Sequence, residues 1–343
     1  MRIIFIAVCV ILAACSNIKK HEPREIERSF YYWKSVFKLS TEEKNAITDL
    51  KIQTLYIKYF DIDWNDASQI ALPIAQLTMP DSNFLRITQL NIVPTVFITN
   101  ETIFKINILQ TKELAENIML LVKKMNINFG ISIKEMQIDC DWTESTKEKY
   151  FSLLKYLKQL DNELIFSATI RLHQIKYLNK TGVPPVKKGM LMCYNMGNLA
   201  NVETHNSILE LNETKKYIGN LNTYPLPLDV AFPLFEWKVL FRQGIFKGLM
   251  ENMPDSLMNE NIFTKKENKY VALVDTTICG YEIKRNDVVR LEQCSYSDLL
   301  QVVNLISNKL KTGNIKVSLF DLDKLTLKKY TQHEIENICD AMR

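Results

Sequence analysis

Short runs rich in β-branched and aromatic residues alternate with amphipathic segments from Ser29 to the end of the chain. This alternation is typical of parallel strands, because each parallel connection needs a crossover that is usually a helix. The sequence predicts strands at 30–35, 54–63, 93–99, 135–142, 165–172, 190–196, 228–235 and 315–320. It predicts helices at 41–50, with an N-cap at Ser40, and at 111–125, 147–160, 213–221, 297–310 and 328–342.

Eight strands with intervening helices predict a (β/α)₈ barrel of the TIM type, in one domain over 29–343. A doubly wound sheet is the alternative fold. It is disfavoured because no glycine-rich phosphate turn follows the first strand and the whole chain holds only 9 glycines. Residues 263–292 break the alternation, and we expect them to form a β-hairpin inserted between strands seven and eight.

The first fourteen residues have the form of a signal peptide, with Arg2 followed by an apolar run over 3–11 that is too short to span a membrane. Leu12-Ala13-Ala14-Cys15 resembles the lipobox of bacterial lipoproteins, which implies that Cys15 is acylated, as with palmitate. Residues 15–28 would then be the lipidated cysteine and a polar tether. The alternative is an ordinary cleaved signal peptide that happens to contain a cysteine. Because Ser16 is not aspartate, we expect an outer-membrane lipoprotein, with the periplasmic or surface-exposed side left open.

Composition excludes several classes of function. The net charge of +4 is spread along the chain, which argues against nucleic-acid binding. The 4 histidines lie far apart, and the cysteines left after processing lack the spacing of metal sites, so no metal or cofactor is expected. The oligomeric state stays open.

Polar residues gather where the predicted strands end, which is the face of such a barrel that carries chemistry. Those at the ends of strands two, four, five, six, seven and eight are Asp61, Asp63, Trp64, Asp139, Asp141, Trp142, Arg171, His173, Tyr194, Asn195, Glu236, Trp237 and Asp321. Because side chains alternate along a strand, Gln137, Asp139 and Asp141 share one face, as do Thr169, Arg171 and His173. Each of these residues alone has a structural explanation as a helix cap, an ion-pair partner or a satisfied core histidine. Together they predict a hydrated or ligand-filled pocket.

The aromatic residues at the same strand ends suggest what the pocket holds. Trp64, Trp142 and Trp237 each follow polar residues. Any one of them could be a core residue, but three at one mouth suit the apolar faces of a sugar ring. The predicted partner is therefore a glycan or oligosaccharide.

Two motifs strengthen this expectation. Asp139-Cys140-Asp141-Trp142-Thr143 resembles, with one change, the Asp-x-Asp-x-Glu signature on the fourth strand of the chitinase-type (family 18) glycoside hydrolases. Met192-Cys193-Tyr194-Asn195 resembles their sixth-strand signature in full. The resemblance implies a (β/α)₈ barrel in which Asp141 orients the substrate's acetamido group, Tyr194 bonds to that group and Asp139 tunes Asp141.

A second resemblance covers the mature chain, above all residues 30–34, 137–143, 167–174 and 229–242. These segments are similar to a family of bacterial lipoproteins that have a glycosidase-like barrel and no assigned activity.

Thr143 stands where the family 18 signature has its general acid, and a hydroxyl cannot serve as that acid near neutral pH. Glu144 is adjacent, but alternation along a strand points it to the other face. One hypothesis is a glycoside hydrolase whose acid is Glu236, Asp61, Asp63 or Asp321. The other is a glycan-binding lipoprotein on a barrel that has lost its acid. A structural or interaction role is the third alternative.

Overall fold

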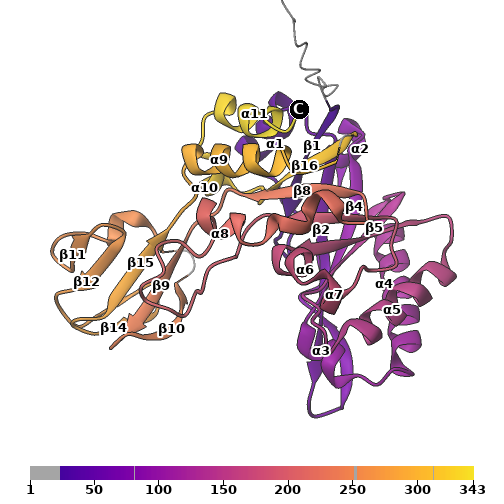
Figure 1. The fold of residues 1–343 in the computed structure, drawn as a ribbon, viewed down its shortest axis with the longest axis horizontal. Helices are drawn as coiled ribbons and strands as arrows, with labels where there is room; N and C mark the ends of the chain where they lie inside the picture. The colour runs from indigo at the N-terminus through magenta and orange to yellow at the C-terminus, as the bar shows by residue number, and fades with distance from the viewer. Residues whose placement is uncertain (1–23, 81, 251–252, 312) are drawn as a thin grey trace, which may run out of the picture.

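Eight parallel strands close into a barrel in the computed structural model, which describes residues 24–80, 82–250, 253–311 and 313–343 (Figure 1). These strands are β1 (Ile26–Tyr32), β2 (Thr54–Asn65), β4 (Asn91–Ile98), β5 (Glu135–Asp139), β6 (Ile165–Arg171), β7 (Lys188–Met192), β8 (Leu228–Pro233) and β16 (Ile315–Phe320). Their order is β1-β16-β8-β7-β6-β5-β4-β2, and β1 also pairs with β2, so no edge stays open. The predicted barrel is confirmed, and the alternative prediction of a doubly wound sheet is wrong.

The barrel begins at Ile26, three residues before the predicted boundary at Ser29. Arg24 is already fixed, because its guanidinium donates to Ser307 Oγ at 2.8 Å and to the Met342 carbonyl at 3.0 Å. The predicted signal peptide and the lipidation site at Cys15 lie outside the described residues.

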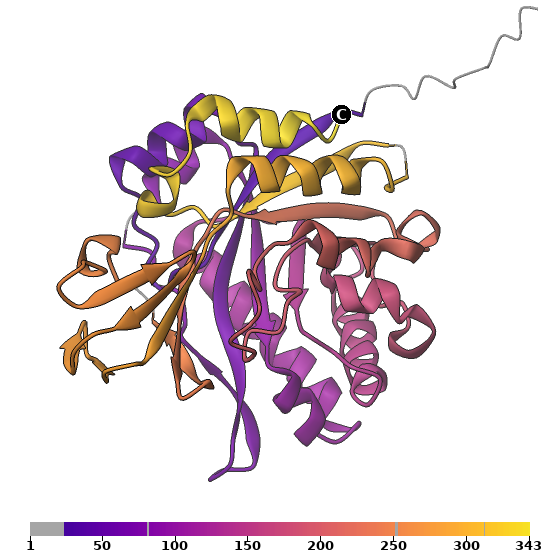
Figure 2. The ribbon, with the colours of Figure 1, turned by 60° about the vertical axis from the view of Figure 1, so that its left-hand side comes forward.

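Helices cover the barrel (Figures 1 and 2). They are α1 (Thr41–Asp49), α2 (Asn83–Thr88), α3 (Asn100–Lys105), α4 (Gln110–Phe129), α5 (Lys147–Leu160), α6 (Leu172–Lys176), α7 (Leu178–Thr181), α8 (Leu211–Lys215), η1 (Ile218–Thr223), α9 (Tyr296–Ser307), α10 (Lys324–Leu327) and α11 (Gln332–Asp340). Ser40 caps α1 in a capping box with Glu43, and α5 has the predicted bounds. The predicted helix at 213–221 is instead the short α8 followed by η1. None of the described helices is long and apolar enough to cross a membrane.

Several barrel strands end earlier than predicted, and in two of them this changes where candidate site residues lie. β5 stops at Asp139 and β7 at Met192, so Asp141, Trp142, Tyr194 and Asn195 lie in the loops that follow. The alternation of side chains along a strand therefore does not extend to these residues. Local geometry and distant partners decide where they point.

The insertion between β8 and β16 lies where it was predicted, but it is larger than a hairpin. It contains β9 (Trp237–Arg242), β10 (Ile245–Met250), η2 (Asp255–Leu257), β11 (Phe263–Lys266), β12 (Lys269–Ala272), β13 (Thr276–Ile278), β14 (Tyr281–Ile283) and β15 (Val288–Glu292). A five-stranded antiparallel sheet, ordered β10-β9-β15-β12-β11, packs over a small core that includes Phe263 and Val289. It projects from the barrel on the left of Figure 1. Trp237 belongs to this sheet and not to the seventh barrel strand.

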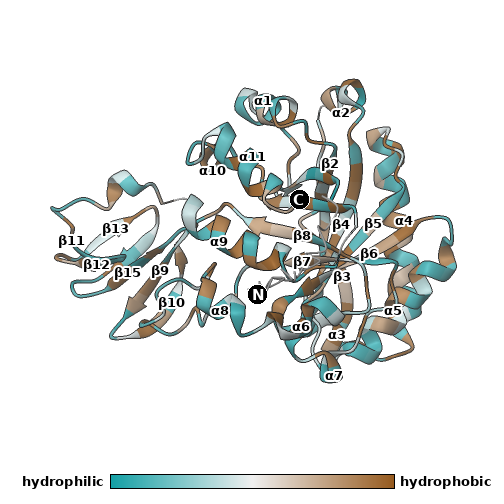
Figure 3. Cartoon of the chain, turned by 45° about the horizontal axis from the view of Figure 1, so that its top comes forward, coloured by the Kyte–Doolittle hydropathy of each residue, from teal (hydrophilic) through white to brown (hydrophobic). Residues whose placement is uncertain are grey.

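The barrel interior is polar, in contrast to the apolar layer beneath the helices. Brown, apolar segments predominate along β4 to β8 in Figure 3, whereas teal segments gather on outlying helices and loops. Inside the ring of strands, the buried Ser167 donates to Glu135 at 2.7 Å and the Tyr31 hydroxyl donates to Gln137 at 2.6 Å. Polar groups buried inside a barrel need hydrogen-bond or ion-pair partners. At the two ends of this barrel, charged side chains are among those partners.

Candidate functional site

Two carboxylates and one guanidinium meet at the carboxyl ends of β5 and β6. Asp139, the last residue of β5, is buried and accepts a hydrogen bond of 2.6 Å from Thr169 Oγ1. Arg171, the last residue of β6, lies 3.7 Å from Asp139 and forms a closer ion pair with Asp141 through its Nε atom. The structure thus confirms that Arg171 is a charge partner of the carboxylates at the end of the neighbouring strand.

Asp139 and Asp141 lie in different environments. Burial raises the pKa of Asp139, Arg171 lowers it, and the charges of Asp141 and Asp61 raise it further, so the net direction is upward. The Asp141 side chain is 50% exposed and lines a cavity. A buried carboxyl with a raised pKa beside an exposed carboxylate is an arrangement found at acid–base sites.

That cavity has a volume of about 220 Å³. The polar residues lining it are Asp141, Arg171, His173, Tyr194, Asn195 and Tyr217. The Arg171 guanidinium also lies 5.8 Å from the centre of the Tyr194 ring. Burial lowers the pKa of His173, which favours the neutral imidazole in this wall. Four predicted site residues besides Asp141 are therefore brought together here: Arg171, His173, Tyr194 and Asn195.

A run of aromatic rings extends from the cavity across the barrel mouth. Phe320, at the end of β16, lies 5.5 Å from Tyr194, 5.4 Å from Trp33 and 5.8 Å from Phe235 between ring centres. Trp237 lies 5.4 Å from Phe235 and donates from Nε1 to Glu292 at 2.8 Å. Trp33, Phe235 and Tyr217 were not predicted as site residues. Trp33 directly follows β1, but the predicted strand at 30–35 extended past it, so the strand-end rule did not identify it.

Trp142 requires a correction, because it cannot stack on a sugar. Its side chain is 0% exposed, its ring stacks on Tyr150 at 5.1 Å, and its Nε1 atom donates to the Thr181 carbonyl at 2.9 Å. The loop after β5 turns the indole under α5, where it is a core residue.

The carboxylates of β2 have separate environments. Asp61 pairs in register with Phe97 of β4, which pairs with Asp139 of β5, so Asp61 and Asp139 lie at one level of the barrel. Lys58 binds Asp61 at 3.0 Å. Asp63 instead accepts from Thr99 at 3.1 Å and from the Trp64 amide at 2.9 Å, which ties β2 to the start of α3. Trp64 is partly buried on the β2–β3 hairpin, formed with β3 (Ile70–Ile74), and donates to Asp66.

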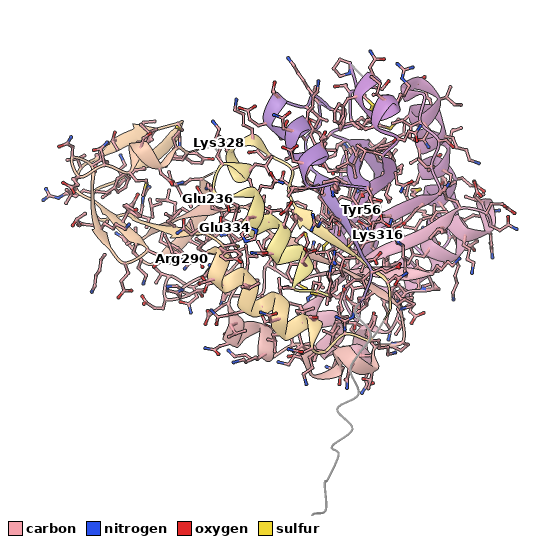
Figure 4. All side chains as sticks on the ribbon, turned by 90° about the horizontal axis from the view of Figure 1, so that it is seen from above. Tyr56, Glu236, Arg290, Lys316, Lys328 and Glu334 are labelled. Atoms are coloured by element: carbon pink, nitrogen blue, oxygen red, sulfur yellow. The ribbon has the colours of Figure 1, made fainter. Side chains whose placement is uncertain are left out.

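The remaining acid candidates lie outside this group. Glu236 forms ion pairs with Lys329 and, at 3.4 Å, with Lys238. Figure 4 shows it between the insertion and the barrel. Thr143 Oγ1 bonds with Ser145 Oγ at 2.9 Å and so belongs to the turn that starts α5.

Asp321 lies beside Lys34 and Asp323 rather than beside Asp141. Burial, and then the charge of Asp323, raise the pKa of Asp321 to about 6, although Lys34 opposes the shift. Because the folded state prefers the protonated form, ionisation of Asp321 lowers stability as the pH rises from about 4 to about 6.

We therefore expect Asp321→Asn to stabilise the protein by about 1–3 kcal/mol at pH 8 and to have little effect at pH 4. Urea unfolding at the two pH values measures this. Asp323→Asn is the matched control, for which the expected change in stability has the opposite sign. Burial raises the pKa of Asp323, but its hydrogen bond and ion pair with Lys34 outweigh burial and lower it, so this variant should lose stability at pH 8. A destabilised Asp321→Asn protein at pH 8 would contradict the prediction.

Comparison with known proteins supports the fold. No family model matches the chain, and no curated protein sequence matches it. Among solved structures, it is similar to the spore cortex-lytic enzyme SleL of Bacillus cereus, with a TM-score of 0.55 and 11% identity over 93% of this chain and 75% of the other. It is similar to a chitinase of Chromobacterium violaceum, with a TM-score of 0.54 and 8% identity over 91% and 98% of the two chains.

A third similar structure is a GH18 chitinase of Cycas revoluta in complex with (GlcNAc)4, with a TM-score of 0.54 and 11% identity over 92% and 99% of the two chains. At such low identity these likenesses establish the fold alone. The chain has a glycoside-hydrolase-like (β/α)₈ barrel that is remotely similar to the family 18 enzymes.

Proposed function

We propose that this protein is a lipoprotein, anchored to a membrane through Cys15, that hydrolyses glycans in the cavity at the carboxyl ends of β5 to β7. The observation that carries the proposal is the polar cavity lined by Asp141 and Arg171 beside aromatic rings, with the buried Asp139 paired to Arg171 beneath it. A cavity of about 220 Å³ offers carboxylate, hydroxyl and amide groups to a sugar ring. The neighbouring rings of Phe320, Phe235 and Trp33 suit its apolar faces.

Asp141 is the residue that would contact the reacting sugar, because its carboxylate is half exposed and lines the cavity. Asp139 would act through Asp141 and Arg171 as a positioning residue, because it is buried beneath them. The acid candidate best placed is Asp61. One of its carboxyl oxygens is buried without a hydrogen-bond partner among the described residues.

The spacing of the strands suits a two-carboxylate mechanism. β2 and β5 are separated only by β4, and adjacent strands lie about 4.8 Å apart, so the backbones of Asp61 and Asp139 are separated by roughly 10 Å. Carboxyl groups about 6.5–9.5 Å apart are typical of glycosidases that invert the anomeric centre. The separation of the Asp61 and Asp141 carboxyl groups would decide between inversion and retention, and NMR of the first product anomer measures the outcome.

Glycan binding without hydrolysis is the second candidate, and one observation favours it. Thr143 is turned into the start of α5, and Arg171 pairs with Asp141. The described residues that line the cavity thus include no carboxyl group without a cationic partner. Such a barrel would hold its glycan through stacking and hydrogen bonds alone.

A parallel screen separates the two candidates. Full-length protein in detergent is incubated with chitin oligosaccharides and with peptidoglycan, and both reducing ends and bound glycan are measured. Release of reducing ends supports the hydrolase. Binding without cleavage supports the second candidate. If the protein neither binds nor cleaves these glycans, both candidates are contradicted.

Replacing Cys15 with alanine tests the anchor. We expect the wild-type protein to incorporate labelled palmitate and to sediment with membranes, and the Cys15→Ala variant to lose both properties, because none of the described helices is long and apolar enough to cross a membrane. Cys9→Ala is the matched control, since Cys9 lies within the predicted signal peptide. Equal labelling of wild-type and Cys15→Ala protein would contradict the proposal.

Trp33 should contribute to glycan affinity. Its ring is only partly buried and continues the aromatic run through Phe320. We expect Trp33→Ala to weaken glycan binding about tenfold, because a stacked aromatic contact contributes roughly 0.5–1.5 kcal/mol beyond its buried area. Trp64→Ala, on the β2–β3 hairpin, is the control, and isothermal titration calorimetry is the measurement. If only the Trp64 variant loses affinity, the stacking surface lies on the hairpin instead.

A further inference from the structure

The chain enters the barrel at the end opposite the glycan cavity, and Arg24 is fixed there. Besides the two hydrogen bonds given above, its second guanidinium nitrogen donates to the carbonyls of Ser307 and Leu310 at 2.9 Å each. Ser307 ends α9, and Leu310 lies between α9 and β16. The Glu25 carbonyl then accepts from the Ile315 amide at 3.2 Å, at the first residue of β16. The chain is therefore held from Arg24 onward at the amino-terminal end of the barrel.

The segment 15–24, between the proposed lipid anchor and this fixed point, is short. Nine peptide units separate Cys15 from Arg24. A fully extended chain spans at most about 3.6 Å per residue, so the segment reaches no farther than roughly 32 Å. This length limits how far the amino-terminal end of the barrel can lie from the membrane that holds Cys15.

The β2–β3 hairpin projects at the other end of the barrel. Ser29 of β1 pairs in register with Thr54 of β2. β1 begins at Ile26, three residues before Ser29, and β2 ends at Asn65, eleven residues after Thr54, so fourteen steps separate the two ends. At about 3.3 Å per residue and a strand tilt of about 36°, the hairpin turn lies roughly 35–40 Å from Ile26 along the barrel axis. Figure 2 shows the indigo start of β1 near the carboxyl terminus and the purple hairpin on the opposite side of the ribbon.

These two lengths are incompatible with a cavity that opens toward the anchoring membrane. In that orientation the hairpin turn would lie nearest the bilayer, and Arg24 would have to stand roughly 35–40 Å above it on a segment that reaches about 32 Å. The turn cannot make up the difference by entering the bilayer. It contains the polar, exposed residues Asp66, Ser68 and Gln69, and a carboxylate such as Asp66, whose side chain is 76% exposed, is costly to remove from water.

We propose that the glycan cavity faces away from the anchoring membrane, so that its substrate is a glycan chain held above that membrane and not the headgroup of a glycolipid within it. This inference rests on the proposed function, because it needs both the anchor at Cys15 and the glycan cavity. It adds to that function which glycans the cavity can meet.

The same lengths set the height of the cavity. Asp61 and Asp139 share one level of the barrel, and Asp61 lies four residues before the end of β2. Ten steps from Ile26 correspond to roughly 27 Å along the axis, and a fully extended segment 15–24 raises this level to a ceiling of roughly 60 Å above the bilayer. Glycan within that distance is the substrate that the anchored barrel can reach.

Fluorescent labels on the lipidated protein in phospholipid vesicles test the orientation without any glycan. Ala67 is exposed in the hairpin turn, and Lys134 is exposed directly before β5 at the other end of the barrel. Ala67→Cys and Lys134→Cys are each made in a Cys279→Ser background, because Cys279 is exposed whereas the other free cysteines of the described residues are buried. The vesicles contain phosphatidylethanolamine, phosphatidylglycerol and a lipid with a quencher on its headgroup. We expect the label at position 134 to be quenched at least twofold more than the label at position 67.

Flotation of the vesicles separates failure of the orientation from failure of the anchor. If the protein floats with the vesicles but the label at position 67 is quenched as strongly as the label at position 134, the orientation is refuted and the anchor stands. If the protein does not float, the anchor is contradicted, and the orientation falls with it.

Presentation of the glycan tests the substrate class. Soluble fluorescent chitotetraose is bound to the vesicle-anchored protein, and a chitotetraose-linked lipid is added either in the same vesicles or in separate ones. We expect the separate vesicles to compete at least tenfold better at equal glycan concentration. Equal competition would overturn the proposal. Absence of any chitotetraose binding or cleavage would count against the proposed glycan site, while the labels still report the orientation.

A longer segment is the matched control. A glycine-serine insertion of about 30 residues between Lys20 and His21 behaves as a flexible coil and more than triples the maximum reach. The cavity could then turn toward its own membrane, so glycolipid in the same vesicles should compete as well as glycolipid in separate ones. A preference for separate vesicles that persists in this variant would show that the length of the segment 15–24 does not set the orientation, and would overturn the argument.

Discussion

Asp141→Asn should reduce the release of reducing ends from the glycan at least a hundredfold while leaving the protein folded. Asparagine has the shape of aspartate but cannot accept or donate a proton as a carboxylate does, and positioned proton transfer contributes typically 10²–10⁴-fold to rate. The Asp141 side chain is 50% exposed, so the substitution does not place an unpaired polar group in the core at position 141. Arg171 keeps Asp139 as a partner at 3.7 Å.

Glu144→Gln is the matched control for this variant. Glu144 is three residues along the same loop and is exposed, and its one ion pair among the described residues is with Lys180 at 3.7 Å. We expect its activity to equal that of the wild type. Thermal unfolding of both variants decides the interpretation. A large loss of stability in Asp141→Asn would identify a structural ion pair rather than a reacting group.

Glu292→Gln should destabilise the protein by about 3–5 kcal/mol, because it leaves the buried Arg290 guanidinium without a counter-ion. Both side chains are 0% exposed and lie 2.6 Å apart. Arg290 also donates to the carbonyls of Asn201 and Leu199, at 2.6 and 3.0 Å. Glu292 accepts from the Ser207 amide at 2.8 Å and from Trp237.

This ion pair therefore fastens the loop 195–209 to the inserted sheet. The same loop supplies Asn195 and Met196 to the wall of the glycan cavity. It folds back tightly at Gly197, where a Cβ atom would lie 2.7 Å from the Ser207 Cα atom. Hydrogen exchange of 195–209 should accelerate in Glu292→Gln, because the loop loses its anchor on β15.

Glu282→Gln is the control for the buried pair. Glu282 lies in the same inserted sheet region, is exposed, and pairs with Lys284 at 2.8 Å. An exposed pair of this kind contributes little to stability, so the midpoint of unfolding should not move. If Glu292→Gln unfolds at the same denaturant concentration as Glu282→Gln, the ion pair does not hold the loop.

Local pattern alone determined the elements of the barrel. The helix α5 and the strand β16 have their predicted bounds, and Ser40 caps α1 as expected. These features depend on residues close in sequence: the apolar period of a helix, the β-branched run of a strand and the side chain that caps a first turn. The grouping of Asp141, Arg171 and Tyr194 also followed from sequence, because the carboxyl ends of adjacent parallel strands meet at one edge.

Contacts between distant residues decided the rest. The sequence predicts Trp142 at the mouth of the barrel, but the loop after β5 buries it against Tyr150. Glu236 follows the seventh strand as predicted, yet Lys329 from the far end of the chain pairs with it. The extent of the insertion depends on the pairing of β9 with β15, whose residues lie about fifty positions apart. Sequence period specifies which face of an element is apolar, but only the packed structure sets which distant side chain meets each polar group, and so which carboxylates remain available for chemistry.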